Sequence, residues 1–575
     1  MDLEASAGSP SARHLTRRGF LGTAAGAAGA IAAAPLLAAC GGNAPAKTGS
    51  TTASQLAKIL PAYQPRSIAG LTPDFPSVNG TAPGYLNYPT TLARTVSGVP
   101  GSGGSYTGTA PYWGAIPRTS GNTYYQAINE ALGATLNLAP ANGNLIINSL
   151  PPLFAGHKLP DWIDVPTWAQ PPGFGQATQG QLADLTPYLS GDKIKEYPNL
   201  AAIETVGWQQ GVWNDRIYGI PTVVQQFTTG FYLFYRADIL DKLGIGTPSI
   251  KSAADLLALG KEINAPNAKR WAFDDIWGYL YQPFGVPAGA GTTAGWTIND
   301  KGDLITQYET ENIIEAMNWE RQLFQQGMVN PDSVAGQSST AKNRFYAGQM
   351  VITADGSGSW NYSDAIAGAA ANKGYERAAV PFFTASGSGT PKMPLAPPTE
   401  YLSYFNKNLK PDQIRELLRI ADYLAAPFGS YEFTLINYGA ENVDYTMSGN
   451  GPVLTATGQK DVDSGAAVLL ASPNNINNNP GYPSVTKASA QFAAQNAGYG
   501  YKPLFYAMNI TVPNDLTTAN AFGPFVSPTN NIMYEVVRGR SSIADYHSTV
   551  NEWLRNGGTR LKAFYETVRS KYGTA

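Results

Sequence analysis

Residues 231–244 read Phe-Tyr-Leu-Phe-Tyr-Arg-Ala-Asp-Ile-Leu-Asp-Lys-Leu-Gly. The first five are aromatic or aliphatic side chains typical of a buried strand, and the remainder predicts a short helix that ends near Gly244. A strand that runs directly into a helix is the repeating unit of α/β proteins. This stretch therefore predicts an α/β fold for the body of the chain.

The same alternation of strands and helices continues on both sides of this stretch. Short buried strands are predicted at Leu145-Ile146-Ile147, Trp162-Ile163-Asp164-Val165 and Met350-Val351-Ile352. Helices are predicted after Ser252, which has the spacing of a capping box with Asp255, from Thr310 to Gln326, from Asp412 to Ala426 and over the last forty residues. Residues 55–104 are rich in Gly, Pro, Ser and Thr and predict extended surface structure.

Composition narrows the class of ligand. The chain has 575 residues, enough for several domains, and its hydrophobic content of 43% supports ordinary cores. Charged residues make up only 14%, and the net charge of −2 produces no field that would attract nucleic acid. Aromatic rings are plentiful, with 32 Tyr, 21 Phe and 11 Trp. Rings together with uncharged amides and hydroxyls favour a neutral sugar over a uronate as ligand.

The N-terminus has the features of an export signal. Thr16-Arg17-Arg18-Gly19-Phe20-Leu21 resembles a twin-arginine signal, and the apolar stretch that follows is shorter than the roughly 20 residues that span a bilayer. Leu37-Ala38-Ala39-Cys40 resembles the lipobox of bacterial lipoproteins, in which the cysteine carries the lipid. Cys40 is the only cysteine, so no intramolecular disulfide can form. We expect a signal peptide at 1–39 and a flexible linker at 40–54.

Seven segments carry a further resemblance through their order and spacing. They are 159–164 (LPDWID), 181–188 (QLADLTPY), 217–221 (IYGIP), 236–240 (RADIL), 284–285 (FG) with Trp296 downstream, 345–353 (FYAGQMVIT) and 438–445 (YGAENVDY). Together they resemble the extracellular solute-binding proteins of ATP-driven carbohydrate importers, and specifically their large LplA/YtcQ-like branch. The resemblance extends from about residue 105 to about residue 570.

The resemblance implies a type II periplasmic-binding-protein-like fold, in which two α/β lobes are joined by crossing strands with the ligand in the cleft between them. Lobe one is expected at 55–225 plus 355–400, and lobe two at 226–354 plus 401–575. The implied function is that of a monomeric receptor, lipid-anchored through Cys40 on the outer face of the cytoplasmic membrane. It would bind an oligosaccharide by cleft closure and deliver it to an ABC transporter permease.

The resemblance fails at one place. Many members of this branch carry a calcium loop with several acidic ligands, but the corresponding residues 264–270 read NAPNAKR. Carboxylates are the ligands that Ca²⁺ prefers, so no calcium is expected there. We predict no metal and no cofactor.

Candidate ligand-binding residues should follow strands, at the cleft edge of each sheet and at the crossings. Ring stacking is expected from the aromatic members of the set, and hydrogen bonds to ligand hydroxyls from the others. Any one of these tryptophans could equally be a core residue, and each polar residue could be a solvated loop side chain. The set comprises Trp113, Trp168, Gln225 (or Gln226), Trp277 (or Tyr281), Asp355, Trp360, Glu400 and Tyr401. Trp162 and Trp213 are assigned to packing.

Enzymatic function receives little support. Three histidines and a lipid-bearing cysteine leave almost nothing for zinc or thiol catalysis. The sequence Gly356-Ser357-Gly358-Ser359-Trp360 is a turn and lacks the context of a nucleophile elbow. The alternatives that stay open are a secreted carbohydrate-active enzyme with two carboxylates, a glycoside hydrolase or lyase, and a sugar-sensing or adhesion lipoprotein.

Overall fold

The computed structural model describes residues 50–113, 116–118, 120–287, 295–336, 340–462, 464–526 and 531–573. The predicted signal peptide, Cys40 and most of the predicted linker lie outside the described residues. The chain from Thr48 to Ala575 forms one compact unit. It contains two larger β-sheets, each with its own hydrophobic cores.

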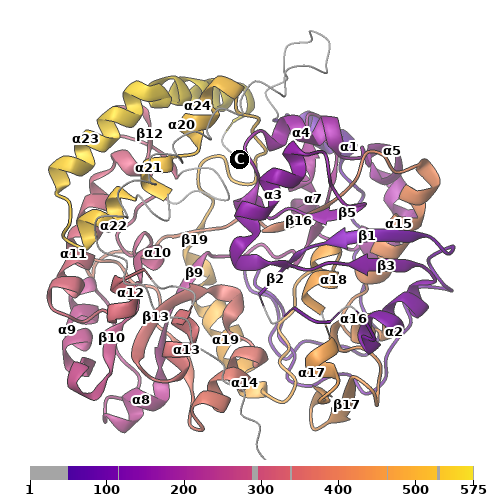
Figure 1. Cartoon of the computed structure of the whole chain (residues 1–575), viewed down its shortest axis with the longest axis horizontal. Helices are drawn as coiled ribbons and strands as arrows, with labels where there is room; N and C mark the ends of the chain where they lie inside the picture. The colour runs from indigo at the N-terminus through magenta and orange to yellow at the C-terminus, as the bar shows by residue number, and fades with distance from the viewer. Residues whose placement is uncertain are drawn as a thin grey trace, which may run out of the picture. The chain divides into compact units, whose positions relative to one another are not determined.

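A five-stranded sheet forms the centre of the first lobe (Figure 1). Its order is β3-β1-β5-β16-β8, with β1 (Ser105–Thr109), β3 (Thr135–Leu138), β5 (Trp162–Asp164), β8 (Gly219–Thr222) and β16 (Tyr401–Phe405). Strand β1 pairs in parallel with β3 and β5, whereas β16 is antiparallel to β5 and β8. The strand predicted at Trp162-Ile163-Asp164-Val165 is confirmed as β5.

Successive side chains of the central strands face opposite sides of this sheet, as the pleat requires. Trp162 and Phe405 are fully buried in one core, and Ile163 and Tyr404 in another. Each such burial stabilises the fold by about 1.5–3 kcal/mol. The first core is closed by α2 (Thr123–Leu132), α15 (Pro411–Leu424), α16 (Tyr431–Tyr438) and α18 (Ser464–Leu470), and the second by α3 (Ile146–Ala155) and α4 (Phe174–Gln181).

A four-stranded sheet forms the centre of the second lobe, in the order β10-β13-β9-β14. Its strands are β9 (Phe231–Arg236), β10 (Trp271–Phe273), β13 (Met350–Gly356) and β14 (Arg377–Ala379). Strand β9 leads directly into α8 (Ala237–Lys242), which confirms the strand–helix unit predicted at 231–244. Strands β10 and β13 are parallel, and β9 runs antiparallel to both β13 and β14.

Helices cover both faces of this second sheet. Leu233 and Tyr235 of β9 face a core built with α9 (Ala253–Ile263), α11 (Glu311–Gln325), α22 (Ile532–Val537), α23 (Ile543–Trp553) and α24 (Thr559–Tyr572). Tyr232 and Phe234 face the core of α13 (Ala341–Tyr346), α14 (Tyr362–Ala371) and α19 (Pro483–Asn496). Ser252 caps α9 as predicted, because its Oγ accepts a hydrogen bond from Asp255 N at 3.1 Å.

The chain passes between the two lobes three times, at 223–230, 395–400 and 472–482. The first crossing hydrogen-bonds to both of the others. Gln225 N donates to Pro398 O at 2.9 Å, and Asn475 N donates to Val224 O at 2.8 Å. The two-lobed organisation with crossing segments is therefore confirmed.

The lobe memberships predicted for 355–400 and for 401 to about 470 disagree with the strand pairing. Arg377–Ala379, expected in lobe one, pairs with β9 of the second lobe. Tyr401–Phe405, expected in lobe two, pairs with β5 and β8 of the first lobe, and the helices from 411 to 470 pack on the same sheet. Pairing between strands far apart in sequence decides these memberships, and no local pattern encodes such pairing.

Two local predictions also fail. Leu145-Ile146-Ile147 does not form a strand, because Ile146 begins α3 and the apolar residues Ile146, Leu150 and Phe154 recur every four positions on its buried side. Residues 50–54, expected in the flexible linker, belong to the ordered body of the chain. Ser50 Oγ donates to Asn509 O at 3.1 Å, and Thr52 caps α1 (Ala53–Ile59).

Candidate ligand-binding site

Three aromatic side chains from separate segments meet at the cleft edge of the first-lobe sheet. Trp113 follows β2 (Pro111–Tyr112), Trp168 lies in a short turn after β5, and Tyr401 opens β16. The ring centroid of Trp113 lies 6.3 Å from that of Trp168 and 6.0 Å from that of Tyr401. Trp113 is 48% exposed, so its ring is accessible to a ligand. We call Trp113, Trp168 and Tyr401 the aromatic shelf.

A pocket of about 680 Å³ adjoins the shelf and is lined by residues of both lobes. Trp168 belongs to both the shelf and the pocket. The first lobe contributes Ile147, Trp168, Gln170, Phe174, Gln176 and Trp213, and the second lobe contributes Phe231, Tyr281, Gln282, Gln307, Tyr308, Thr517, Asn520 and Phe522. Rings with scattered amides and hydroxyls form the lining typical of a site for a small organic ligand.

Gln282 and Thr511, both in the pocket lining, each have a buried polar atom without a hydrogen-bond partner. Gln282 donates through Nε2 to Phe231 O at 3.2 Å, but its Oε1 has no partner. Thr511 Oγ1 is likewise buried without a partner. A buried polar group without a hydrogen bond costs about 1–3 kcal/mol, so a side-chain rotation that brings these atoms to the pocket surface would let a ligand hydroxyl group satisfy them.

Interactions behind the pocket hold other lining amides in place. Tyr565 donates its hydroxyl to Asn520 Oδ1 at 3.0 Å. Gln307 Oε1 accepts from Gly295 N at 3.0 Å. Gln176 Nε2, on the first lobe, donates to Val512 O of the second lobe at 3.1 Å. These amides are therefore preorganised, which lowers the entropy cost of binding.

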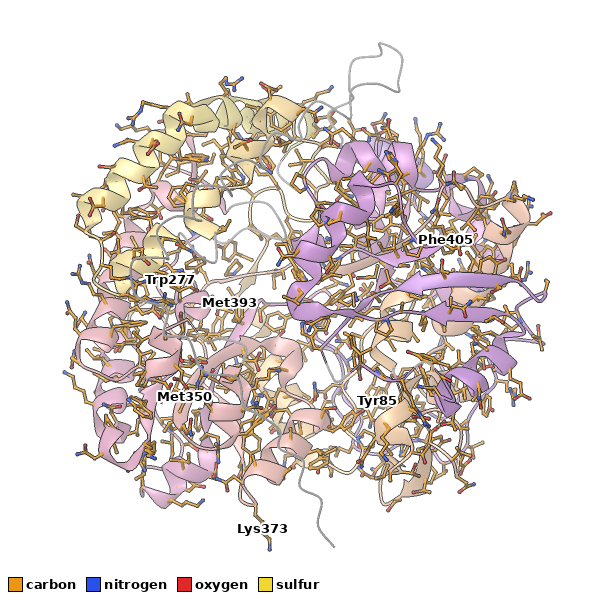
Figure 2. All side chains as sticks on the ribbon, viewed as in Figure 1. Tyr85, Trp277, Met350, Lys373, Met393 and Phe405 are labelled. Carbon is orange, nitrogen blue, oxygen red and sulfur yellow. The ribbon has the colours of Figure 1, made fainter. Side chains whose placement is uncertain are left out.

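Of the eight predicted site residues only Trp168 lines the pocket; Trp113 and Tyr401 belong to the shelf, Glu400 precedes Tyr401, and the other four lie elsewhere. Trp360 is 7% exposed and packs against Phe234 and Phe492. Trp277 is also buried, among the side chains of the second lobe (Figure 2). Its predicted alternative Tyr281 lines the pocket. These two tryptophans are core residues because helices close over their rings.

The other two predicted site residues that lie away from the pocket are polar. Gln225 lies inside the crossings, where its Oε1 accepts from Asn475 Nδ2 at 2.6 Å and its Nε2 donates to Phe227 O at 3.0 Å. Asp355 lies near Lys342 at 3.6 Å and Arg377 at 3.8 Å. Both side chains therefore already interact with other residues of the same chain. The assignments of Trp162 and Trp213 to packing agree with their burial, although Trp213 also borders the pocket.

Two carboxyl groups lie close to the shelf. Glu400 precedes Tyr401, and its main-chain oxygen accepts from Thr167 N at 2.9 Å. Burial raises the pKa of Glu400 to about 7. Asp164 ends β5 with both carboxyl oxygens buried and unpartnered, and burial raises its pKa well above the ordinary range. Burial, followed by the charges of Glu400 and Asp164, raises the pKa of the Tyr401 hydroxyl.

Replacing Glu400 by glutamine is expected to stabilise the protein above pH 7 and to change little near pH 4. With its pKa raised to about 7 by burial, Glu400 in the folded chain holds a proton that the unfolded chain releases near its ordinary pKa of about 4.3. The free energy of unfolding therefore falls as pH rises through this window. The side chain is partly exposed, so we expect a gain of about 1–3 kcal/mol for Glu400→Gln at pH 8. Calorimetric melting of both proteins across pH 4–8 measures the difference in their free energies of unfolding. A difference that does not depend on pH would contradict the prediction.

Several pocket residues were not predicted from the sequence. Gln170 and Gln176 lie in a Pro- and Gly-rich segment directly after Trp168, and that position after β5 was a usable signal. Thr511 and Asn520 lie far from any strand end, and no local pattern marks them. Only packing of the C-terminal segment against the pocket identifies them.

Neither a metal site nor a membrane span is found in the described residues. Within them, no group of three or more His, Cys, Asp or Glu side chains could hold a metal ion. Across the same part of the chain, every helix is too short or too polar to cross a bilayer.

Comparison with known proteins gives one family match. The model of the bacterial extracellular solute-binding proteins matches residues 115–474. The sequence matches no curated protein significantly.

Solved structures share the fold at low sequence identity. An HMO-binding, ABC-transporter-associated solute-binding protein from Bifidobacterium longum infantis superposes with a TM-score of 0.60 at 11% identity, covering 82% of this chain and 100% of that one. An N-glycan transport solute-binding protein from Streptococcus pneumoniae, in complex with Man1GlcNAc, gives 0.56 at 13% identity, covering 82% and 99%. An alginate-binding protein without calcium ion gives 0.54 at 15% identity, covering 83% and 98%.

Proposed function

Because the chain belongs to the family of bacterial extracellular solute-binding proteins, we propose that it binds an oligosaccharide in the pocket and delivers it to an ABC-type importer. The observation that carries the proposal is a pocket, lined by both lobes, that combines aromatic rings with the polar atoms of amide and hydroxyl side chains. Sugar C–H faces pack on rings, and sugar hydroxyls satisfy such atoms. The structural neighbours named for glycan ligands support the same class of ligand.

Because both lobes line the pocket, a permease could recognise the bound state through the closure of the lobes. A ligand that contacts Trp168 and Tyr281 at once interacts with both lobes, so its binding favours the arrangement in which the lobes are closed around it. The three hydrogen-bonded crossings are the segments about which the lobes would turn. A permease would recognise the closed, loaded form of a monomeric protein.

A thermal-shift screen of oligosaccharides tests this function. At a ligand concentration of 100 times Kd, binding stabilises the folded state by about 2.7 kcal/mol, and the melting temperature rises accordingly. We expect at least one oligosaccharide to raise it and to be recovered intact. Release of new reducing ends by the purified protein would instead support the carbohydrate-active enzyme. If a strain that lacks the gene for this protein takes up the sugar as well as the parent strain, a sensing or adhesion role is supported.

We further propose that Cys40 anchors this extracellular protein to the outer face of the cytoplasmic membrane, after export through a twin-arginine signal. The spacing of the arginine pair, the apolar stretch and the cysteine supports this. Cys40→Ala is expected to release the protein into the medium with unchanged oligosaccharide affinity, because the pocket lies in a separate part of the chain. Fractionation and calorimetry measure the two effects, and retention on the membrane would contradict the anchor.

A further inference from the structure

Residues 509–514 connect the two lobes at a place outside the three crossings. Asn509 Nδ2 donates to two main-chain oxygens of the first lobe, Gln210 O at 2.6 Å and Val212 O at 2.7 Å. Because the amide nitrogen carries two N–H groups, Asn509 can make both hydrogen bonds at once. We call residues 509–514 the interlobe segment.

Further contacts of the interlobe segment involve α4 of the first lobe. Gln176 Nε2 donates to Val512 O at 3.1 Å and to Asn514 Oδ1 at 3.3 Å. Gly175 lies so close to Thr511 that a methyl group at this position would overlap Thr511 Oγ1 and lie 3.0 Å from Thr511 Cβ. A glycine at position 175 therefore permits the close approach of the segment to α4.

Both flanks of the interlobe segment are fixed in the core of the second lobe. The ring centroid of Phe505 lies 5.2 Å from that of Tyr565, and Leu516 is buried in the same core. Phe505 and Ala507 have positive φ angles of 62° and 54°. Residues other than glycine rarely adopt this conformation, which persists only where surrounding contacts impose it. The core of the second lobe and the hydrogen bonds of Asn509 together hold the chain in this bend.

The interlobe segment also forms part of the pocket wall. Ile510, Thr511 and Val512 line the pocket, as does Gln176 on the opposite lobe. When the lobes turn apart about the crossings, a wall fixed to the second lobe moves away from the first lobe. The hydrogen bonds of Asn509 and Gln176 must therefore break before the pocket can open.

We propose that the interlobe segment is a noncovalent fourth connection that holds the lobes closed without ligand, and that Asn509 is the positioning residue that sets the ratio of open to closed molecules. The inference goes beyond the proposed function, because it concerns contacts between the lobes and not the ligand. Opening of the pocket then limits the rate at which any ligand enters or leaves it.

Single-molecule energy transfer in the ligand-free, full-length chain measures this ratio. One dye is attached at Glu130→Cys on α2 of the first lobe and the other at Glu552→Cys on α23 of the second lobe, and both positions are exposed. Cys40→Ala removes the native cysteine, so that the dyes attach only at these two positions. Parting of the lobes changes the distance between the dyes and separates open from closed molecules.

Asn509→Ala should raise the ratio of open to closed molecules about 10-fold, which corresponds to about 1.4 kcal/mol for the two lost hydrogen bonds. Asn437→Ala is the matched control, because Asn437 Nδ2 donates to Phe433 O at 2.9 Å within the first lobe. This control removes an amide of the same kind without touching the second lobe, and its ratio should equal that of the parent protein. Equal ratios in the two variants overturn the role of Asn509.

Gly175→Ala tests the interlobe segment without removing a hydrogen-bonding group. Its methyl group should push Thr511 away from α4 and raise the ratio of open to closed molecules about 10-fold. Gly180→Ala places the same group on the same helix in open space and should leave the ratio unchanged. If neither Asn509→Ala nor Gly175→Ala exceeds its control, the segment does not hold the lobes closed. Because no ligand is present, that outcome leaves the proposed binding function standing.

Discussion

Arg236→Ala is expected to lower the free energy of unfolding by about 3–5 kcal/mol, because it leaves a buried carboxylate without its main cation. Arg236 has no exposed surface, and its Nε and Nη2 donate to Asp238 at 2.8 Å and 2.9 Å. Its Nη1 donates to the main-chain oxygens of Phe345 and Tyr346, at the end of α13. One guanidinium thus joins β9, α8 and α13. Urea unfolding monitored by tryptophan fluorescence measures the loss.

Arg415→Ala provides the matched control. Arg415 pairs with Asp412 at 3.0 Å, but the two side chains are 52% and 99% exposed. Solvent screens such a surface pair, so its removal should cost less than about 0.5 kcal/mol. If both variants unfold at the same urea concentration, the buried pair does not contribute the stability that its geometry implies.

Trp168→Ala is expected to weaken oligosaccharide binding by about 30- to 100-fold, which corresponds to about 2–3 kcal/mol. Trp168 is the one aromatic side chain shared by the shelf and the pocket. Its loss removes the surface on which a sugar face would pack and lets the neighbouring Trp113 ring move. Calorimetry with the best oligosaccharide from the thermal-shift screen measures the change.

Tyr431→Ala controls for the loss of an aromatic ring. Tyr431 is 39% exposed on α16, packs against Arg94 and does not line the pocket. Its removal should change the affinity less than about 3-fold. A loss of similar size in both variants would indicate a general effect on folding, and an unchanged affinity in Trp168→Ala would remove the shelf from the binding site.

Local sequence patterns predicted the helices and strands whose formation depends on interactions between neighbouring residues. The stretch 231–244 forms β9 and α8, and the Arg-x-Asp spacing within it is the buried pair of Arg236 and Asp238. The helix predicted from Thr310 to Gln326 is α11, and that from Asp412 to Ala426 is α15. Capping, periodicity and strand propensity act over a few residues, so these elements could be found in the sequence.

The candidate site was predictable only in part. Positions after strands led to Trp113, Trp168, Tyr401 and Glu400, which the structure does bring together. The same rule named Trp277 and Trp360, which are buried in cores. A tryptophan after a strand suits a core and a pocket equally well, and only the helices that close over it decide between the two.

The sequence by itself determined the alternating strand–helix units, the low charge that matches the uncharged pocket lining, and the order of the arginine pair, the apolar stretch and Cys40 near the N-terminus. The tertiary structure alone decided that β16 and the helices after it return to the first lobe. It also decided that Thr511 and Asn520, near the C-terminus, complete a pocket with Trp168. These features depend on contacts between residues hundreds of positions apart, whose free energies arise from packing and hydrogen bonding that no short window of sequence contains.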